Sequence, residues 1–349
     1  MKEEEIEFMK SIVKTSPGEG NIRLVDMPEP QPGPKDVKIK VEYAGICGTD
    51  IHISHDEFPT RPPVILGHEF SGVIVEIGSD VTKYKVGDRV VAENSWQTCG
   101  VCYLCRSGRD TLCPERITVG LHQNGVFAKY VLYKEHLLHK IPENVDMLSA
   151  ALTEPLACVV HGILENSRIN TGDVVVVTGP GPIGLLAAQV AESQGAVVVL
   201  VGTSADENRL TIAKDLGIDY IVNVEQGNSG DLIDSLTQKQ GADVILECSG
   251  NESAAQMGLD LVKKLGIFTQ IGLYGKPIRL DFDKINFKEL KIFGCLAQTN
   301  YSYRRSLKLL SENKVNTKKL VSHILPLEEW EEGFKIAELK KGMKVVLKP

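Results

Sequence analysis

The stretch Val174-Val-Val-Val-Thr-Gly179-Pro-Gly181-Pro182-Ile183-Gly184 decides the fold of this chain. Its β-branched half is typical of a parallel strand buried on both faces. The apolar run that follows, 185–192, predicts a helix. Between such a strand and a helix, Gly-x-Gly-x-x-Gly predicts a dinucleotide-binding turn: the glycines permit a tight turn, and the helix N-terminus faces a pyrophosphate. The alternative is a Gly/Pro loop without a ligand. The predicted cofactor-binding residues of the turn are Gly179, Gly181, Pro182, Ile183 and Gly184.

Strands and helices alternate through the next hundred or so residues. Such alternation predicts a doubly wound parallel sheet, the Rossmann arrangement, with the ligand at the carboxyl ends of the strands. The expected strands are 196–201, 220–223, 243–247, 266–272 and 290–294, and the expected helices are 210–216, 231–239 and 254–265. Cys248 and Gly272 lie at strand ends among small residues, so we expect both to line the cofactor groove. Cys248 and Cys295 are also expected to be packing thiols.

The end of strand 196–201 should select the cofactor. An acidic residue about twenty positions after the glycine turn would bond the ribose hydroxyls and repel a 2′-phosphate. The chain has Gly202-Thr203-Ser204 there, with Asp206 only in the following turn and Arg209 beyond it. We expect Thr203, Ser204 and Arg209 to contact the cofactor. Arg209 is suited to a 2′-phosphate but equally to a solvated helix face, so NAD and NADP both remain open.

The residues before this region predict a β-rich domain. From Ile12 to Val91, Pro and Gly turns separate short strands, and 36–43 alternates as a half-buried strand does. Further strands are expected at 70–77 and 125–132, and 85–91 is expected to form a turn that leads into another strand. Helices are expected at 148–161, 301–313 and 328–340. A final strand, 344–348, is expected to return to the first domain. The predicted class is therefore α/β, with a β-barrel-like domain formed by 1–157 and 297–349 and an inserted Rossmann domain, 158–296.

Two motifs in the barrel domain offer metal ligands. Cys47-Gly-Thr49-Asp-Ile-His52 supplies a thiol, a hydroxyl and an imidazole, and Gly-His68-Glu69 follows further along. A thiolate, an imidazole and a carboxylate are ligand types that hold a catalytic zinc with one position open. A lone Cys or His is more often a packed core residue, but this combination is much harder to obtain by chance.

A lobe at 95–115 carries Cys99, Cys102, Cys105 and Cys113, spaced x2, x2 and x7. Four thiolates at such spacing predict a closed tetrahedral zinc site. An iron–sulfur cluster is the rival interpretation, because a Cys-x2-Cys-x2-Cys run also suits clusters. A closed site has no position for a substrate, so the predicted role is structural.

Glu154 precedes Pro155 in an otherwise apolar stretch. A buried carboxylate without a partner is costly, so this one should be paired or directed at a metal. The alternative is a carboxylate at a helix start, where the helix dipole favours it. Cys158 and His161, further along the same stretch, are expected to be helix-packing residues.

Composition narrows the functional class. The chain has 349 residues, 42% of them hydrophobic and 24% charged, and a net charge of −7, which argues against broad binding to nucleic acid or anionic membranes. The acidic N-terminus is unlike a signal peptide, and no apolar run reaches the length of a membrane span. We therefore expect a cytoplasmic protein whose eight cysteines serve metal sites or packing. Residues 1–8, which precede a second candidate start at Met9, are interpreted as a dispensable extension or a cloning remnant.

From Met9 onward, these motifs together resemble the zinc-dependent medium-chain dehydrogenases. Gly-His68-Glu69 combined with Thr-Glu154-Pro-Leu-Ala-Cys is similar to the branch that contains sorbitol, arabitol-phosphate and galactitol-phosphate dehydrogenases. The resemblance implies a GroES-like barrel domain, one catalytic and one structural zinc per chain, NAD or NADP, and a homodimer or homotetramer. It also favours zinc over a cluster in the four-cysteine lobe.

The resemblance further implies residue roles. Cys47, His68 and Glu69 would hold the catalytic zinc, with Glu154 at the zinc as a ligand or through zinc-bound water. Thr49 would take the hydroxyl proton and His52 would pass it towards solvent. The implied reaction is the reversible oxidation of a secondary alcohol of a polyol or polyol phosphate to a ketone.

One departure from the branch concerns the substrate. Sorbitol dehydrogenases have an Arg-Tyr pair after the last Rossmann strand, where this chain has Ala297-Gln298. Gln298 is either a substrate contact or an exposed loop residue. The candidates for a substrate phosphate are His55, Arg61 and Lys129. The alternatives are a threonine-type amino-alcohol dehydrogenase and a non-catalytic nucleotide-binding relative, which would have a broken metal site.

Overall fold

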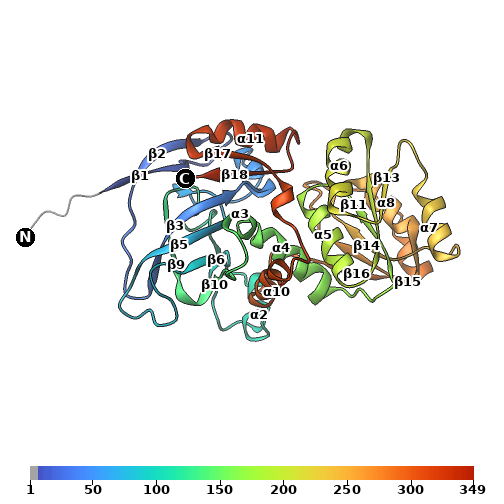
Figure 1. The fold of residues 1–349 in the computed structure, drawn as a ribbon, viewed down its shortest axis with the longest axis horizontal. Coiled ribbons are helices and arrows are strands. Elements are labelled where there is room, and N and C mark those ends of the chain that lie inside the picture. The colour runs from blue at the N-terminus through green and yellow to red at the C-terminus, as the bar shows by residue number, and fades with distance from the viewer. Residues whose placement is uncertain (1–6) are drawn as a thin grey trace, which may run out of the picture. The chain divides into compact units, whose positions relative to one another are not determined.

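A computed structural model describes residues 7–349; the first six residues, which make up most of the predicted extension, lie outside the described part. The chain divides into two compact units (Figure 1). Unit 1 contains Met1–Glu154, Thr299–Leu307 and Val321–Pro349, and unit 2 contains Pro155–Gln298 and Lys308–Leu320. Among the described residues, no helix is both long and apolar enough to span a membrane.

Unit 2 is built on a six-stranded parallel sheet with the strand order β13-β12-β11-β14-β15-β16. Its strands are β11 (Val174–Thr178), β12 (Val197–Gly202), β13 (Tyr220–Asn223), β14 (Ala242–Glu247), β15 (Val262–Gln270) and β16 (Lys291–Gly294). Every residue of β11 is buried, as its β-branched run predicts. The order reverses between β11 and β14, which is the ligand-binding position of a dinucleotide-binding sheet. The predicted doubly wound Rossmann sheet is confirmed.

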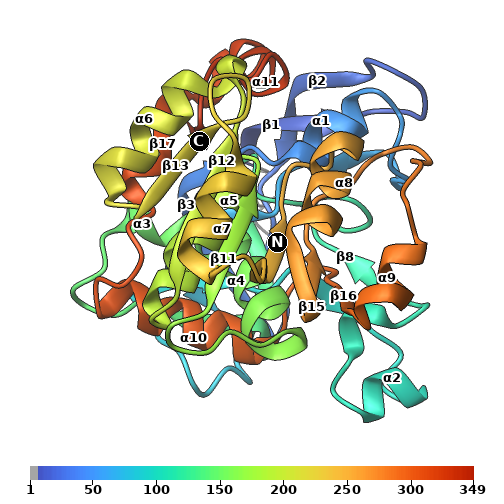
Figure 2. The ribbon, with the colours of Figure 1, turned by 90° about the vertical axis from the view of Figure 1, so that its right-hand side faces the viewer.

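Helices pack around this sheet (Figure 2). They are α4 (Thr153–Val160), which begins at the unit boundary, α5 (Pro182–Ser193), α6 (Glu207–Leu216), α7 (Ser229–Thr237), α8 (Glu252–Leu261) and α9 (Asp283–Lys288). Local chemistry sets several of their ends. The Asn251 side chain caps α8 by accepting from the backbone N–H groups of Ser253 and Ala254. Gly217, in the left-handed conformation, ends α6.

Unit 1 consists mainly of antiparallel sheets around an apolar core that includes Ile39, Phe70 and Phe127. The strands are β1 (Phe8–Lys14), β2 (Ile22–Pro28), β3 (Asp36–Gly45), β4 (Val64–Ile65), β5 (Glu69–Ile77), β6 (Arg89–Ala92), β7 (Ser95–Gln97), β8 (Ile117–Thr118), β9 (Tyr130–Lys134), β10 (Leu138–Lys140), β17 (Val321–Pro326) and β18 (Lys344–Lys348). The α-helices that begin in this unit, besides α4, are α1 (Gly48–Ser54), α2 (Tyr103–Arg106), α3 (Met147–Ala150), α10 (Asn300–Ser311) and α11 (Trp330–Glu338). Strand β18 pairs with β3, so the C-terminal strand returns to the first domain as expected.

Three predicted elements are corrected by the structure. The helix expected at 148–161 is divided into α3 and α4, because residues 151 and 152 form a turn between them. The helix expected at 254–265 ends at Leu261, because the chain from Val262 pairs with β14 instead. The strand expected at 125–132 is regular only from Tyr130. Its first residues hydrogen-bond to the backbone at 65–67, where Gly67 has a positive φ of 85° and no regular ladder forms.

The domain boundaries differ by a few residues at 155–157 and 297–298, and more widely in one segment. The sequence-based division placed all of 297–349 in the first domain, whereas Lys308–Leu320 belongs to unit 2. Two hydrogen bonds tie this segment to unit 2: the backbone N–H of Asn316 donates to Gln189 at 2.7 Å, and Lys319 Nζ donates to the Asp215 carbonyl at 2.5 Å. Helix α10 therefore begins in one unit and ends in the other.

An ion-pair cluster on unit 1 predicts a pH-dependent stability. The Glu338 and Glu19 carboxylates, 2.7 and 3.4 Å from the His55 ring nitrogens, raise the pKa of His55. This stabilisation is therefore complete below the unfolded pKa of about 6.5 and is lost as pH rises through the higher folded pKa. We expect His55→Gln to lower the thermal-unfolding midpoint at pH 6 but not at pH 9. The effect should correspond to less than about 1 kcal/mol, because the pairs are exposed.

The matched control is His136→Gln, since His136 is exposed and forms no ion pair within residues 7–349. If the thermal-unfolding midpoint of His55→Gln lay below that of the parent by the same amount from pH 5.5 to 9, the proposed contribution of the charged His55 to stability would be contradicted.

Candidate metal centres and active site

The structure brings Cys47, His68 and Glu69 together. One ligand atom from each lies within 4.8 Å of the others. Cys47 caps the N-terminus of α1, His68 immediately precedes β5, and Glu69 is its first residue. His68 and Glu69 are buried, while Cys47 is partly exposed, so the group is accessible to solvent mainly on the side of Cys47.

Two glycines make this arrangement possible. Gly67, in the left-handed region, turns the chain so that His68 enters the cluster, and a side chain at Gly67 would strike the ring of Phe127. Gly45 lies opposite Glu69 in the β3–β5 ladder. A Cβ at Gly45 would collide with the Glu69 carboxylate and crowd Lys344 at 3.0 Å.

Buried charges surround the three ligands. Lys344, from β18, pairs with Glu69 Oε2 at 2.5 Å, and both side chains are almost fully buried. Asp50, completely buried, accepts a hydrogen bond from the Cys47 backbone N–H at 2.9 Å, and its other oxygen lies 3.9 Å from His68 Nδ1. Glu154 is also buried nearby, so among the described residues the Asp50, Glu69 and Glu154 carboxylates all act on this region together with the Lys344 ammonium. This region favours additional positive charge.

The titration of the site reflects this imbalance. Burial opposes a charge on His68, but the Cys47 thiol and the Asp50 and Glu154 carboxylates raise its pKa well above the ordinary value. Burial raises the pKa of Asp50, with a further contribution from Glu69. Three buried polar atoms, Asp50 Oδ1, His68 Nδ1 and Glu69 Oε1, have no hydrogen-bond partner among the described residues. A divalent cation held by a thiolate, an imidazole and a carboxylate fits both the unsatisfied atoms and the charge.

The remaining predicted catalytic residues lie in the same unit. Glu154 accepts a hydrogen bond from Asn94 Nδ2 at 2.9 Å, and its charge acts on both His68 and Lys344. Thr49 Oγ1 lies 3.7 Å from Cys47 Sγ. His52, one turn further along α1, has a 39% exposed side chain and contacts Glu57 at 2.5 Å.

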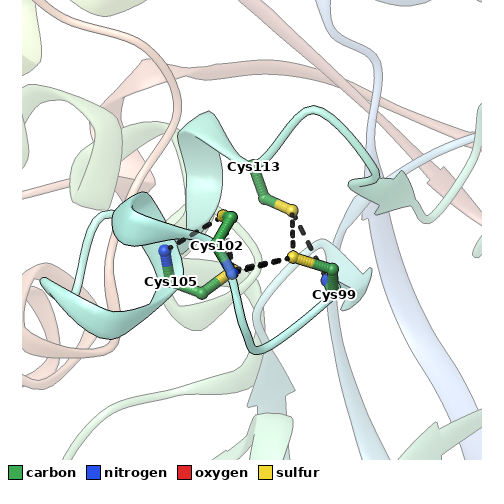
Figure 3. A group of neighbouring side chains, drawn as sticks. All are labelled: Cys99, Cys102, Cys105 and Cys113. Carbon is green, nitrogen blue, oxygen red and sulfur yellow. Dashed lines mark hydrogen bonds between the residues drawn. The ribbon is translucent and has the colours of Figure 1, made fainter.

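The four cysteines of the lobe converge on one point (Figure 3). Sulfur–sulfur distances are 3.5 Å for Cys102–Cys105, 3.6 Å for Cys99–Cys113 and 3.9 Å for Cys99–Cys105. Thiolates 2.3 Å from a tetrahedral zinc stand about 3.8 Å apart, whereas a cluster of several irons needs a wider cage. Backbone N–H groups of Cys102 and Val101 lower the pKa of Cys99 to about 7, whereas burial raises the pKa of Cys105 to about 11. The geometry fits a single tetrahedral ion.

The glycine turn of unit 2 has the shape of a pyrophosphate cradle. Gly179 has a φ of 86°, and a Cβ there would strike Ser249. A Cβ at Gly184 would collide with the Gly179 carbonyl, so this glycine allows close packing of helix on strand. Gly181, the N-cap of α5, faces open space instead, since the nearest atom to its hypothetical Cβ is Arg209 Nη1 at 3.9 Å. Pro182 and Ile183 form the first turn of α5.

The end of β12 is more constrained than its sequence indicates. The Asp206 carboxylate accepts from the Thr203 backbone N–H and hydroxyl at 3.1 and 3.0 Å. The Ser204 N–H donates to Glu225 at 3.2 Å. The Arg209 side chain is only 15% exposed and lies by the glycine turn, so it is not a solvated helix residue.

Several important residues were missed in the sequence. Glu247, at the end of β14, is fully buried and accepts from Thr178 Oγ1 and from the backbone N–H groups of Ser249 and Gly250. It thereby fixes the loop after Cys248, which packs close to Gly272. A Glu inside an apolar strand was the available signal. Asp50 lies within the Cys47–His52 motif that the sequence analysis identified. No pattern in the sequence around Lys344 or Asn94 pointed to the site.

Other candidates lie elsewhere. Within residues 7–349, His55 is held by two carboxylates, Arg61 lies near His122, and Lys129 stands over the ring of Tyr130. Gln298 is buried and accepts from the Cys158 thiol at 3.6 Å, so the exposed-loop interpretation is wrong. Burial raises the pKa of both Cys248 and Cys295, as expected for packing thiols.

Comparison with known proteins identifies the family. Residues 33–143 match the alcohol dehydrogenase GroES-like domain, and residues 182–312 match the zinc-binding dehydrogenase domain. The chain belongs to the zinc-binding dehydrogenases. It is therefore an oxidoreductase that acts on CH–OH groups with zinc and NAD(P).

Relatives and solved structures cover nearly the whole chain. It is 48% identical to a sorbitol dehydrogenase of Halalkalibacterium halodurans, over 98% of this chain and 99% of that protein. It is 39% identical to a D-arabitol-phosphate dehydrogenase of Enterococcus avium, over 93% of each. A zinc-binding dehydrogenase structure from Sinorhizobium meliloti, bound to NADP, matches with a TM-score of 0.89 and 32% identity, over 98% of this chain and 100% of that one.

The lobe geometry predicts a structural role for its metal. We expect Cys102→Ser to remove one zinc equivalent per chain and to lower the thermal-unfolding midpoint, because the lobe has little apolar core of its own. Metal content and thermal unfolding measure both effects. Cys158→Ser, which alters a packing thiol of unit 2, is the control and should retain all zinc. Full zinc content in Cys102→Ser would contradict a four-thiolate site.

Proposed function

We propose that this dehydrogenase reversibly oxidises a secondary alcohol of a polyol or polyol phosphate to a ketone, with NAD or NADP as the hydride acceptor. The observation that carries the proposal is the buried Cys47–His68–Glu69 group, with the Glu154 carboxylate beside it. Sorbitol and arabitol phosphate, named for two relatives, support a polyhydroxylated substrate.

In this proposal Cys47, His68 and Glu69 hold the catalytic metal, and Cys99, Cys102, Cys105 and Cys113 hold the structural one. When bound, zinc supplies a Lewis acid for the alcohol oxygen, and the nicotinamide accepts the hydride of the carbinol carbon. Asp50 orients the Cys47 backbone, while Lys344 neutralises one carboxylate oxygen of Glu69.

The chain's own residues also provide a route for the hydroxyl proton. Thr49, close to Cys47, would receive the substrate proton while it gives up its own hydroxyl proton towards His52, and His52 would release a proton to solvent. The partial exposure of His52 suits that exit. The contact with His52 lowers the pKa of Glu57.

Unit 2 would bind the cofactor through the glycine turn. Gly181 leaves room for the pyrophosphate at the N-terminus of α5. Thr203 and Ser204 are proposed to contact the adenosine ribose, and Arg209 a phosphate near the turn. Cys248 and Gly272 line the neighbouring strand ends. Eight free thiols also favour a reducing compartment such as the cytoplasm.

A substrate screen at 340 nm tests the reaction. With zinc-loaded protein we expect NAD(P) reduction by at least one of sorbitol, xylitol, arabitol, galactitol or their phosphates. Threonine or butanediol as the sole substrate would instead assign the amino-alcohol or diol activity. Cys47→Ser should lower kcat/KM more than about 100-fold, since losing a direct ligand exceeds the effect of an outer partner.

The Cys47→Ser variant should keep its circular dichroism spectrum and the zinc of the lobe. Cys295→Ser, which alters another partly buried thiol, is the matched control. Wild-type turnover in Cys47→Ser would contradict the proposed metal site.

We also propose that the protein is a homo-oligomer. Strand β16 is the edge of the unit 2 sheet and is largely exposed. Large apolar side chains near this edge are exposed as well: Phe282 by 66%, Phe287 by 78%, Ile292 by 42% and Leu296 by 50%. An exposed edge with apolar neighbours suits pairing with a second copy of the chain.

Light scattering tests this surface. We expect a dimer or tetramer, and we expect Ile292→Lys to shift the mass towards the monomer. Val86→Lys, at an apolar side chain that is 58% exposed on unit 1, is the control and should leave the mass unchanged. An unchanged mass for Ile292→Lys would argue against this edge.

A further inference from the structure

Two side chains, Arg116 and Asn94, form a hydrogen-bonded path from the four-cysteine lobe to Glu154. Asn94 lies between β6 and β7, and its Nδ2 donates to Glu154 Oε1 at 2.9 Å. On its other side, Asn94 Oδ1 accepts from Arg116 Nη2 at 2.7 Å. Asn94 and Glu154 are 5% and 7% exposed. The Asn94–Glu154 bond is therefore shielded from water, where hydrogen bonds that involve a charged group are strongest, and the Arg116–Asn94 bond is partly buried.

Arg116 is anchored to the lobe. Its backbone N–H donates to the Cys113 carbonyl at 3.1 Å, and its Nε donates to Ser95 Oγ at 2.8 Å. Cys113 supplies the fourth thiol of the lobe. The guanidinium that holds Asn94 thus follows the last lobe thiol by three residues.

The donors and acceptors of Arg116 and Glu154 determine which way the Asn94 side-chain amide is turned. A guanidinium only donates hydrogen bonds, so Arg116 must face the oxygen of the Asn94 amide. The amide nitrogen is then turned towards Glu154. A flipped amide would place Oδ1 against the carboxylate and Nδ2 against the guanidinium, so both contacts would be repulsive. Arg116 therefore selects the amide orientation in which Asn94 holds the carboxylate.

We infer that Asn94 and Arg116 are positioning residues, which orient the Glu154 carboxylate for the catalytic metal and link its placement to the structural lobe. This inference rests on the proposed function, in which Glu154 serves that metal. Outer partners of this kind typically change metal affinity or activity 10–100-fold when removed.

A double-mutant cycle on metal binding tests the inference. Protein stripped of the metal at the Cys47 site, with the lobe zinc retained, is titrated with Co²⁺ and followed by thiolate-to-cobalt absorption. We expect Asn94→Ala to weaken Co²⁺ binding about 10–100-fold and to alter the cobalt spectrum. In a Glu154→Ala background the same substitution should change little, because Asn94 acts through Glu154.

Variants of Arg116 and of the lobe form the second part of the test. Arg116→Ala should weaken Co²⁺ binding, and Arg116→Lys should restore part of the affinity. The matched control is Arg106→Ala, which removes an exposed guanidinium of the same lobe. Cys102→Ser, which is expected to lose the lobe zinc, is compared by turnover instead: it should lower kcat/KM in the parent and add little to Arg116→Ala. Asn94→Asp, which keeps the side-chain volume but loses the donor, replaces Asn94→Ala if the latter unfolds.

The outcomes separate the two proposals. If Asn94→Ala changed the Co²⁺ affinity equally in the parent and in the Glu154→Ala background, the positioning role would be overturned and the proposed function would remain intact. Wild-type Co²⁺ affinity and turnover in Glu154→Ala would overturn both the inference and the role of Glu154. Additive effects of Cys102→Ser and Arg116→Ala would overturn the link to the lobe.

Discussion

The concentration of negative charge around Cys47 and His68 is the constraint on which unit 1 depends. Asp50, Glu69 and Glu154 are all buried, and Lys344 is the cation that pairs directly with one of them. Burying an uncompensated carboxylate costs far more free energy than a single hydrogen bond returns. A divalent ion relieves this cost, so metal binding and the stability of this region are coupled.

That constraint also explains the path of the chain. Lys344 is the first residue of β18, and β18 reaches Glu69 only because it pairs with β3 after the chain has left unit 2. Gly45, opposite Glu69 on β3, leaves space for the ion pair. The return of the C-terminal strand to the first domain therefore has a chemical consequence. It places the Lys344 ammonium beside a site whose ligands come from residues 47–69.

Much of this structure was predictable from local sequence. The ligand types of Cys47, His68 and Glu69, the four-cysteine spacing and the glycine turn are each encoded within short stretches. The sheet of unit 2 followed from strand–helix alternation because each β-α unit is built from neighbouring residues. The partners of Glu69 and Glu154 were not predictable. Lys344, which pairs with Glu69, and Asn94 and Arg116, which hold Glu154, come from distant segments that only tertiary pairing brings together. At Val262, similarly, the ladder with β14 outweighed a local helical pattern.

The two proposed metal sites differ in how they depend on the fold. The lobe draws its four thiols from residues 99–113, so a single loop can close around its ion and needs little from the rest of unit 1. The Cys47 site draws on α1, β5, the start of α4 and β18, and no single loop can set its geometry. A site assembled from distant segments needs fixed points, and a metal-closed loop is among the most rigid points that a small stretch of chain can make. Arg116, held by Cys113 and reaching Asn94, is where that rigidity can pass to Glu154. The same reasoning accounts for a closed metal lobe in an enzyme whose chemistry requires only the open one.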